Sequence, residues 1–420
     1  MGDLSMPDRA ALLKQMTDEV ARLVLVNNYD QTLALSLAQL KGADDLAFQQ
    51  RLMQMLEARG ELDRAVEFLP SDAEIADRRS RGEHLTRPEL AVLLAYAKLA
   101  LKDDLLGSSV PDDAYLSGEL VHYFPHELQE RYPHAIETHR LHREIIATGL
   151  ANAIVNQGGP SAMARISDQT GGDAASIARA FAAVRDSYHL PELTAAIDAL
   201  DNKVDGHVQL QLYAAVQDLM VGRTIWFIGN VSFADGIAGV VERYRSGVAA
   251  VAAALDESLP DVWRKDRAAR ISDLVSQSVP EELARRVASM PALAAASDIA
   301  LIAETTGKAI PSAASTFFAA GRYFAIDDLL TQSRSILAPD YYDRLALDRS
   351  LAQLETFLRR ITEAMLAEGV SGEAAVDAYV GRRREEVERM RRTVRDIAQS
   401  GLSLSKLTLA ASLLGDLVKG

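Results

Sequence analysis

The 420-residue sequence contains no cysteine. This absence excludes disulfides, thiolate zinc sites, iron–sulfur clusters and cysteine nucleophiles, and it makes a reducing, cytoplasmic setting the simplest expectation. Long apolar runs are also missing, since no stretch reaches the roughly 18 apolar residues without a charge that a membrane-spanning helix needs. The first ten residues lack the basic start and apolar core of a secretory signal. We therefore expect a chain that is not exported and has no membrane partner.

Aromatic residues and positive charge are scarce as well. Phe, Trp and Tyr make up 6% of the chain, and the formal net charge is −14. Because an acidic protein repels phosphate groups, we expect no nucleic-acid partner. Alanine and leucine dominate the remainder, and both favour helices over strands. With 48% hydrophobic residues, the sequence predicts an all-α protein with a large core.

The clearest helix start is Thr86-Arg87-Pro88-Glu89. Thr86 can cap the amide of Glu89, the Glu89 side chain can reach back, and Pro88 fits the first turn. Small and branched apolar residues then recur with helical spacing, which predicts one buried face made of Leu90, Leu93, Leu94, Ala97 and Leu101.

Similar patterns predict most of the remaining chain to be helical. We expect these further helices at roughly 7–40, 44–59, 72–80, 126–157, 173–187, 191–200, 206–228, 235–255, 261–277, 280–289 and 311–320. Glycine or proline marks most of the joints between them. We place domain joints near Pro111 to Pro125 and near Pro260, which predicts three segments, 1–110, 111–259 and 260–420.

An internal similarity relates residues 166–193 to residues 302–329 at one constant offset. The matched pairs include Phe181 with Phe317, and both segments run into a long helix. Chance similarity between helices is one explanation, and a duplicated helical unit is the other. We favour the duplication, which predicts a multi-helix bundle in which both phenylalanines are buried in equivalent gaps.

Two segments carry residue types that bind metals. Five of the eight histidines fall in residues 122–142, but Glu130 occupies the place of the second histidine in a zinc-binding helix. We interpret the cluster as polar surface and interhelical hydrogen bonding, with a metal site as the alternative. The stretch from Asp201 to Gly206 resembles a calcium loop, but Lys203 stands where an oxygen ligand is required. It is better interpreted as a turn between helices.

Nucleotide-binding and nucleophile motifs are absent from the sequence. No GxGxxG, GxxxxGK[ST] or GxSxG pattern occurs, and the paired carboxylates are adjacent and so point apart on a helix. The arginine run Arg382-Arg383-Arg384 is followed by interleaved glutamates and arginines. Ion pairs on an exposed or interfacial helix explain it, and an acidic partner is the alternative. We therefore predict no catalytic, cofactor-binding or metal-binding residue in this chain.

Both ends of the chain are unusually apolar. Residues 6–39 carry apolar side chains on more than one face, so we expect this helix to be buried on several sides against a region absent here, and to leave some of that surface exposed in this chain. Residues 381–399 predict an amphipathic helix, and the leucines of residues 402–418 are too numerous to remain exposed. The last segment needs a protein surface, either within its own chain, on a neighbouring subunit or on a region absent here.

Several irregular runs of sequence resemble the large bacterial NAD-specific glutamate dehydrogenases. These runs are NNYDQTLALSLAQ (residues 27–39), ARGELDRAVEFLPSDAEIADRR (58–79), LTRPELAVLLAYAKLAL (85–101), HYFPHELQERYPHAIETHRLHREIIATGLANAIVNQGGPS (122–161) and ALDNKV (199–204). The resemblance covers essentially the whole chain and thins in its alanine-rich second half.

This resemblance implies the helical C-terminal region of a much longer polypeptide. The family's catalytic Lys and Asp and its glycine-rich nucleotide loop belong upstream, so no site residue is carried over. Residues 1–110 would continue from a missing catalytic region, and the start at Met1-Gly2 fits a fragment. The implied parent is a cytoplasmic bacterial homo-oligomer of glutamate catabolism that uses NAD to convert L-glutamate to 2-oxoglutarate and ammonia. This chain alone would be inactive and bind no cofactor.

Two functional hypotheses remain at this point. In the first, the chain supports the catalytic region of the same polypeptide and contributes to oligomer contacts. In the second, it is a stand-alone helical adaptor or regulatory scaffold without enzymatic activity. The length of the open reading frame distinguishes them, because only the first requires a long coding region upstream.

Overall fold

A computed structural model describes residues 4–338 and 340–417, and within these ranges it contains helices and no strand. The predicted all-α class is confirmed. Contacts divide the chain into two compact units. Unit 1 comprises the residues up to Arg185 together with Val216–Val240, and unit 2 comprises Asp186–Ala215 and the residues from Val241 onward. The three segments expected from the sequence, 1–110, 111–259 and 260–420, stay a prediction, and the two contact units are a separate description of the chain.

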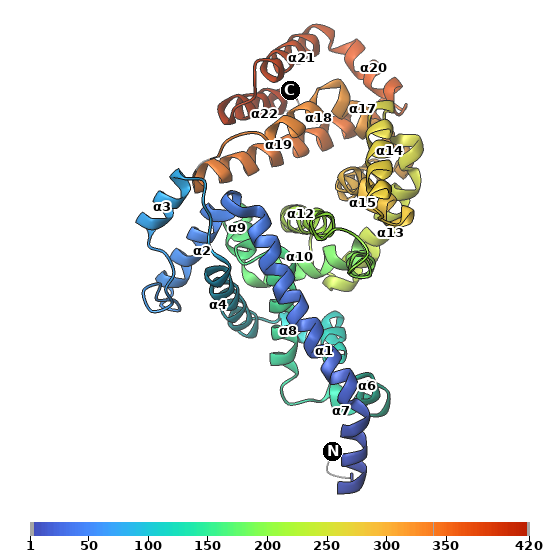
Figure 1. Ribbon diagram of the computed structural model, residues 1–420. Helices are drawn as coiled ribbons and strands as arrows, with labels where there is room; N and C mark the ends of the chain where they lie inside the picture. Colours follow the sequence, from blue (N-terminus) through green and yellow to red (C-terminus); the bar gives the residue numbers. More distant parts are fainter. Residues whose placement is uncertain (1–3, 339, 418–420) are drawn as a thin grey trace. The chain divides into compact units, whose positions relative to one another are not determined.

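The helices before Arg185 belong to unit 1 (Figure 1). They are α1 (Met6–Lys41), η1 (Gly42–Asp45), α2 (Leu46–Ala58), α3 (Asp72–Ser80), α4 (Arg87–Leu106), η2 (Val110–Asp112), η3 (Ala114–Leu116), α5 (Ser117–His122), α6 (His126–Arg131), α7 (Pro133–Glu137), α8 (His142–Gly158) and α9 (Ala162–Thr170). α10 (Ala174–Ser187), α12 (Gly206–Asn230) and α13 (Gly236–Ser258) each contribute residues to both units.

The remaining helices belong to unit 2. They are α11 (Leu190–Asp198), α14 (Asp261–Ser276), α15 (Glu281–Leu293), α16 (Ala296–Thr306), α17 (Ile310–Tyr323), α18 (Ile326–Ser333), α19 (Tyr341–Leu366), α20 (Glu373–Arg382), α21 (Arg384–Gln399) and α22 (Leu404–Leu417). Among the described residues no single helix is long and apolar enough to cross a membrane, although α15 and α16, bent by 55°, pass that test as a pair.

The core of unit 1 forms where α4 packs against α1, α2 and α8. The predicted apolar face of α4 is confirmed, since Leu90, Leu93, Leu94, Ala97 and Leu101 are all buried. The helix also begins as predicted, because the Glu89 carboxylate accepts hydrogen bonds from the Thr86 N–H and hydroxyl at 2.7 and 2.8 Å.

The region expected to be one helix at 126–157 is instead three helices, α6, α7 and α8. Proline lacks an N–H and constrains the residue before it, so a helix tends to end there. Pro133 accordingly begins α7, and Tyr132 before it has φ −134° and ψ 42°, outside the helical region. Residues 138–141 then separate α7 from α8.

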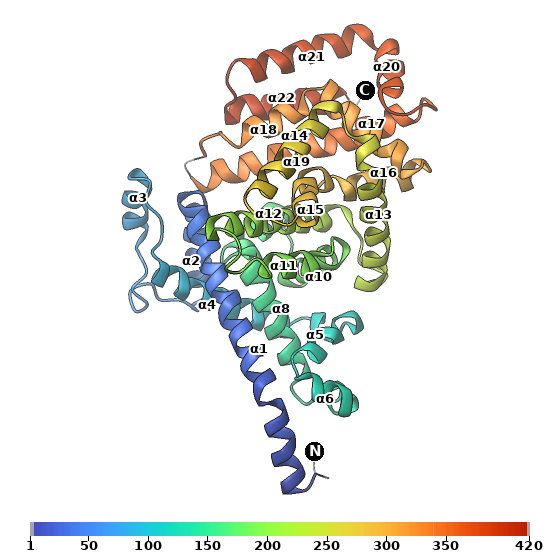
Figure 2. The same cartoon turned by 45° about the vertical axis from the view of Figure 1, so that its right-hand side comes forward.

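The core of unit 2 is organised around α19, which contacts α16, α17, α20 and α22. Figure 2 shows α21 and α22 next to one another, with α22 lying along α19. The inner face of α21 is buried at Val387, Val394 and Ile397, as its amphipathic pattern predicts. α22 buries Leu407, Leu414 and Leu417, so the last apolar segment finds its protein surface within its own chain. Val418, the last apolar residue of that prediction, lies outside the described residues.

Candidate functional site

The most distinctive surface of unit 1 is the N-terminal part of α1. Only Leu12 and Met16 are buried there, whereas other apolar side chains face solvent. These exposed side chains are Met6, Leu13, Val20, Val24, Leu25, Val26 and Tyr29. Leu13, Val20 and Val24 lie at i, i+7 and i+11 and form one stripe along the helix. A continuous apolar stripe of this kind marks a surface for another protein segment.

The C-terminal part of α1 is fixed within unit 1. Ala34, Leu37 and Ala38 are buried, and Arg87 at the start of α4 holds the helix from outside. The Arg87 guanidinium donates to Ser36 Oγ at 3.2 Å, to Gln39 Oε1 at 2.7 Å and to the Thr32 carbonyl at 3.2 Å. One helix therefore has an anchored half and a half with an exposed apolar stripe, and Figure 1 shows it running unbroken between the two.

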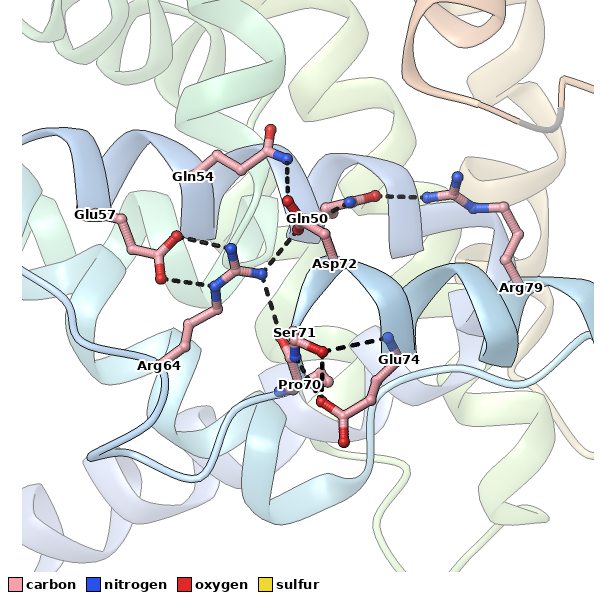
Figure 3. Close-up of polar contacts among 9 residues, drawn as sticks. All are labelled: Gln50, Gln54, Glu57, Arg64, Pro70, Ser71, Asp72, Glu74 and Arg79. Atoms are coloured by element: carbon pink, nitrogen blue, oxygen red, sulfur yellow. Dashed lines mark hydrogen bonds and ion pairs between the residues drawn. The ribbon is translucent and has the colours of Figure 1, made fainter.

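A network centred on Arg64 holds the loop that joins α2 to α3 (Figure 3). Arg64 makes a bidentate pair with Glu57 at 2.8 and 2.7 Å and reaches Asp72 at 2.8 Å and the Pro70 carbonyl at 3.2 Å. The guanidinium, with hydrogen bonds from Gln50 and Gln54, lowers the pKa of Asp72 to about 2. Ser71 and Glu74 form a capping box that starts α3.

Unit 2 contains a pocket of about 730 Å³. The ends of α13 and α17 and the starts of α14, α18 and α20 line it together with α21. Both signs of charge are present, including Arg322, Arg395, Asp327 and Asp377. The lining is therefore polar and carries both carboxylates and guanidinium groups.

Asp327 is the carboxylate in this pocket whose acidity changes most. Burial raises its pKa to about 6, and the hydrogen bond from Trp263 Nε1 at 3.0 Å opposes that rise. Arg391 also lines the pocket, and its guanidinium stacks on Tyr323 at 4.2 Å and donates to the Tyr323 carbonyl at 3.0 Å.

The histidine segment is divided among short helices. His126 and His134 lie in α6 and α7, and His142 Nδ1 lies 3.0 Å from the carbonyl of His139. No group of three or more His, Cys, Asp or Glu side chains that could hold a metal ion occurs in residues 4–338 and 340–417. Asp201 to Gly206 form the turn between α11 and α12, as predicted.

The arginine run forms contacts that sequence spacing alone does not indicate. Arg382 pairs with Glu368 at 2.5 Å, and Arg391 lies 3.8 Å from Glu388. Arg383 instead stacks on Tyr379 at 5.3 Å. The predicted ion pairing is therefore only part of the arrangement, and tyrosine rings supply the rest.

Comparison with known proteins identifies the family. Residues 82–416 match the family model described as the C-terminal region of glutamate dehydrogenase, and residues 1–38 match the catalytic domain of bacterial NAD-glutamate dehydrogenase. The chain belongs to the bacterial NAD-specific glutamate dehydrogenase family.

Three curated relatives named NAD-specific glutamate dehydrogenase show how the match is distributed. The Pseudomonas aeruginosa protein is 38% identical over 100% of this chain and 26% of its own length. The Halomonas elongata protein is 37% identical over 83% of this chain and 22% of its own length. The Mycobacterium tuberculosis protein is 30% identical over 98% of this chain and 25% of its own length. The chain thus spans about a quarter of the relatives that it matches.

Proposed function

We propose that this chain is the non-catalytic C-terminal helical region of an NAD-dependent glutamate dehydrogenase. The parent enzyme oxidatively deaminates L-glutamate to 2-oxoglutarate and ammonia, with hydride transfer to NAD. The chain supports the catalytic region of the same polypeptide and contributes to a cytoplasmic homo-oligomer. The name of the relatives and the match over residues 82–416 support the parent's activity.

The observation that carries the supporting role is the division of α1. The catalytic-domain match covers residues 1–38, which is nearly the whole helix. Yet Ala34, Leu37 and Ala38 are buried in unit 1, while Leu13, Val20 and Val24 are exposed. α1 is then the last helix of the catalytic domain and also part of the C-terminal core. The exposed stripe packs against the remainder of the catalytic domain, and the shared helix fixes the two regions to each other.

Substitutions on the stripe test this role. Val24→Asp should leave the melting temperature of the isolated chain nearly unchanged, because Val24 is already exposed. In the full-length parent, the same change places a charge in an apolar interface and should lower both the melting temperature and glutamate-dependent NADH formation.

Gln15→Asp is the matched control for this experiment. Gln15 is exposed on the same helix and lies roughly 200° around the axis from Leu13, well away from the stripe. It should be tolerated in both proteins. Equal behaviour of Val24→Asp and Gln15→Asp in the full-length enzyme would remove the support for docking through α1.

We also propose that residues 166–193 and 302–329 arose by duplication. α10 and α17 occupy equivalent positions in the two segments and have equal lengths, and Phe181 and Phe317 are both buried. The left-handed residues match too, since Gly171 corresponds to Gly307 and His189 corresponds to Ala325. A non-glycine residue rarely has a positive φ, so the last correspondence is the more specific support.

The stand-alone adaptor is the second candidate. The exposed stripe of α1 equally fits an unrelated protein partner. An open reading frame that begins at Met1 in the source genome would favour the adaptor, whereas a coding region several times longer upstream favours the enzyme.

A further inference from the structure

The loop between α2 and α3, residues 59–71, presents two large apolar side chains to solvent. Phe68 is 89% exposed and Val66 is 65% exposed, whereas Leu62 and Leu69 of the same loop are buried. We propose that Val66 and Phe68 form a docking anchor for the catalytic region of the same polypeptide. This inference rests on the proposed function, because it requires a parent that extends beyond this chain.

The loop is held firmly in the conformation that exposes Phe68. Asp63 Oδ1 accepts hydrogen bonds from the N–H groups of Ala65 and Val66 at 3.0 and 3.3 Å, and the Leu69 N–H donates to the Arg64 carbonyl at 2.9 Å. The Tyr96 hydroxyl on α4 donates to Glu67 Oε1 at 2.8 Å. Together with the Arg64 network in Figure 3, these bonds fix both ends and the middle of the loop.

The backbone of Phe68 is itself unfavourable. Its φ is 55°, in the left-handed region that bulky side chains avoid because the Cβ approaches the backbone oxygen. Strain of this kind persists only where surrounding contacts impose it, and it is concentrated at functional positions. Here the contacts turn an aromatic ring away from the core. Aromatic side chains are enriched in the cores of protein interfaces, and a loop that is already held in its bound conformation loses less conformational entropy on binding.

The position of the loop in the chain identifies its occupant. Residues 39–81 lie between the end of the catalytic-domain match at 38 and the start of the C-terminal match at 82. The loop is therefore part of the junction between the two regions. In the proposed parent the rest of the catalytic domain precedes Met1, 58 residues before the loop, and as part of the same polypeptide it is present at a high effective concentration, which favours it over a free partner for the same surface.

Hydroxyl-radical labelling of Phe68 tests the anchor. The ring should be labelled in the isolated chain and protected in the full-length parent, and the protection should not change when the parent is diluted. Equal labelling of Phe68 in both proteins would overturn the proposal. Protection that appears only as the parent associates, followed by light scattering, would also overturn it, because a second copy would then be the occupant.

The Phe68→Asn variant adds a second measurement. Asparagine tolerates a positive φ, so the isolated chain should keep its melting temperature while losing the ring. The full-length variant should melt at a lower temperature and exchange amide hydrogens faster in residues 59–71. Leu337→Asn is the control, since Leu337 is 90% exposed but lies in unit 2, and it should change neither property. An unchanged full-length Phe68→Asn variant contradicts the anchor.

The protection of α1 separates the two proposals. If α1 is protected from exchange in the parent and Phe68 remains labelled, the anchor is wrong and the role of α1 stands. If neither segment is protected, the proposed support of the catalytic region is wrong as well.

Discussion

The carboxyl group of Asp327 lies where burial acts against its charge. A raised pKa means that the folded protein holds the proton more tightly than the unfolded chain does. The pKa of an aspartate in the unfolded chain is about 4, so the stabilising contribution of the protonated group is complete below that pH. It is lost as the pH rises through about 6, the pKa in the folded protein. Asp327→Asn mimics the protonated form and can still accept the hydrogen bond from Trp263.

We expect Asp327→Asn to stabilise the chain by about 3 kcal/mol at pH 8 and to have little effect at pH 4, as a shift of this size implies. Urea unfolding at the two pH values measures the difference. Asp328→Asn removes a neighbouring charge that adds to the raised pKa of Asp327, so it should stabilise the chain at pH 8 by less than Asp327→Asn does. If Asp327→Asn stabilised the chain equally at both pH values, the charge of the Asp327 carboxylate would not be the cause of the effect.

Asp298 and Arg359 form a buried ion pair that links two helices of unit 2. Asp298 on α16 is 2% exposed, and Arg359 Nη1 on α19 lies 3.3 Å from its Oδ1. Removing one partner of a buried pair leaves a charge that water cannot solvate, at a cost of roughly 3 to 5 kcal/mol. We expect Arg359→Ala to lose about that much in chemical unfolding. Asp298→Asn with Arg359→Met should recover most of the loss, and failure of this recovery would show that packing dominates.

The two apolar faces of α22 differ enough to be compared directly. Leu414 is buried on the helix that packs on α19, whereas Leu409 on the same helix is 52% exposed. Leu414→Ala should cost about 2 to 5 kcal/mol, because it removes buried methyl groups and leaves a cavity. Leu409→Ala should cost less than about 0.5 kcal/mol. Similar melting temperatures for the two variants would mean that α22 does not pack on α19 as described.

A proline substitution tests whether α1 must be one continuous helix. Proline in a helix interior removes a hydrogen bond and costs about 3 kcal/mol. Asn28 is exposed and lies between the anchored and the docking parts of α1. We expect Asn28→Pro to lower the melting temperature and the NADH formation of the full-length parent, while the isolated chain loses only local helicity. Asn28→Ala, which favours the helix, should behave like the unchanged protein in both measurements.

Helical periodicity was sufficient to predict the positions of the helices whose apolar faces are regular. α3 and α10 lie within one or two residues of their predicted ranges, and α4 begins where its capping residues predict, because capping residues and glycine joints act locally. The helix expected at 126–157 was wrong, since the backbone constraint of Pro133 outweighed the surrounding pattern. The exposed stripe of α1 was predictable because apolar residues occur all round the helix.

The loop anchor and the unit 2 pocket were not predictable in the same way. Phe68 has a positive φ without the glycine or asparagine that usually signals one. Arg391 stacks on Tyr323, which is 68 residues earlier in the sequence. Such contacts depend on tertiary packing, so no local pattern reports them.

For the molecule as a whole, the predicted absence of catalysis is the decisive expectation. Hydride transfer requires a nucleotide cradle and a group that polarises the substrate, and the sequence carries no glycine-rich nucleotide motif. The pocket in unit 2 has charged walls but no such arrangement. The purified chain should therefore produce no NADH from glutamate and NAD above a buffer blank, and calorimetric titration with NAD should give no binding heat. The full-length parent, prepared in the same way, is the positive control. NADH formation by the isolated chain would place catalytic residues within these 420 residues and would refute the assignment of a supporting role.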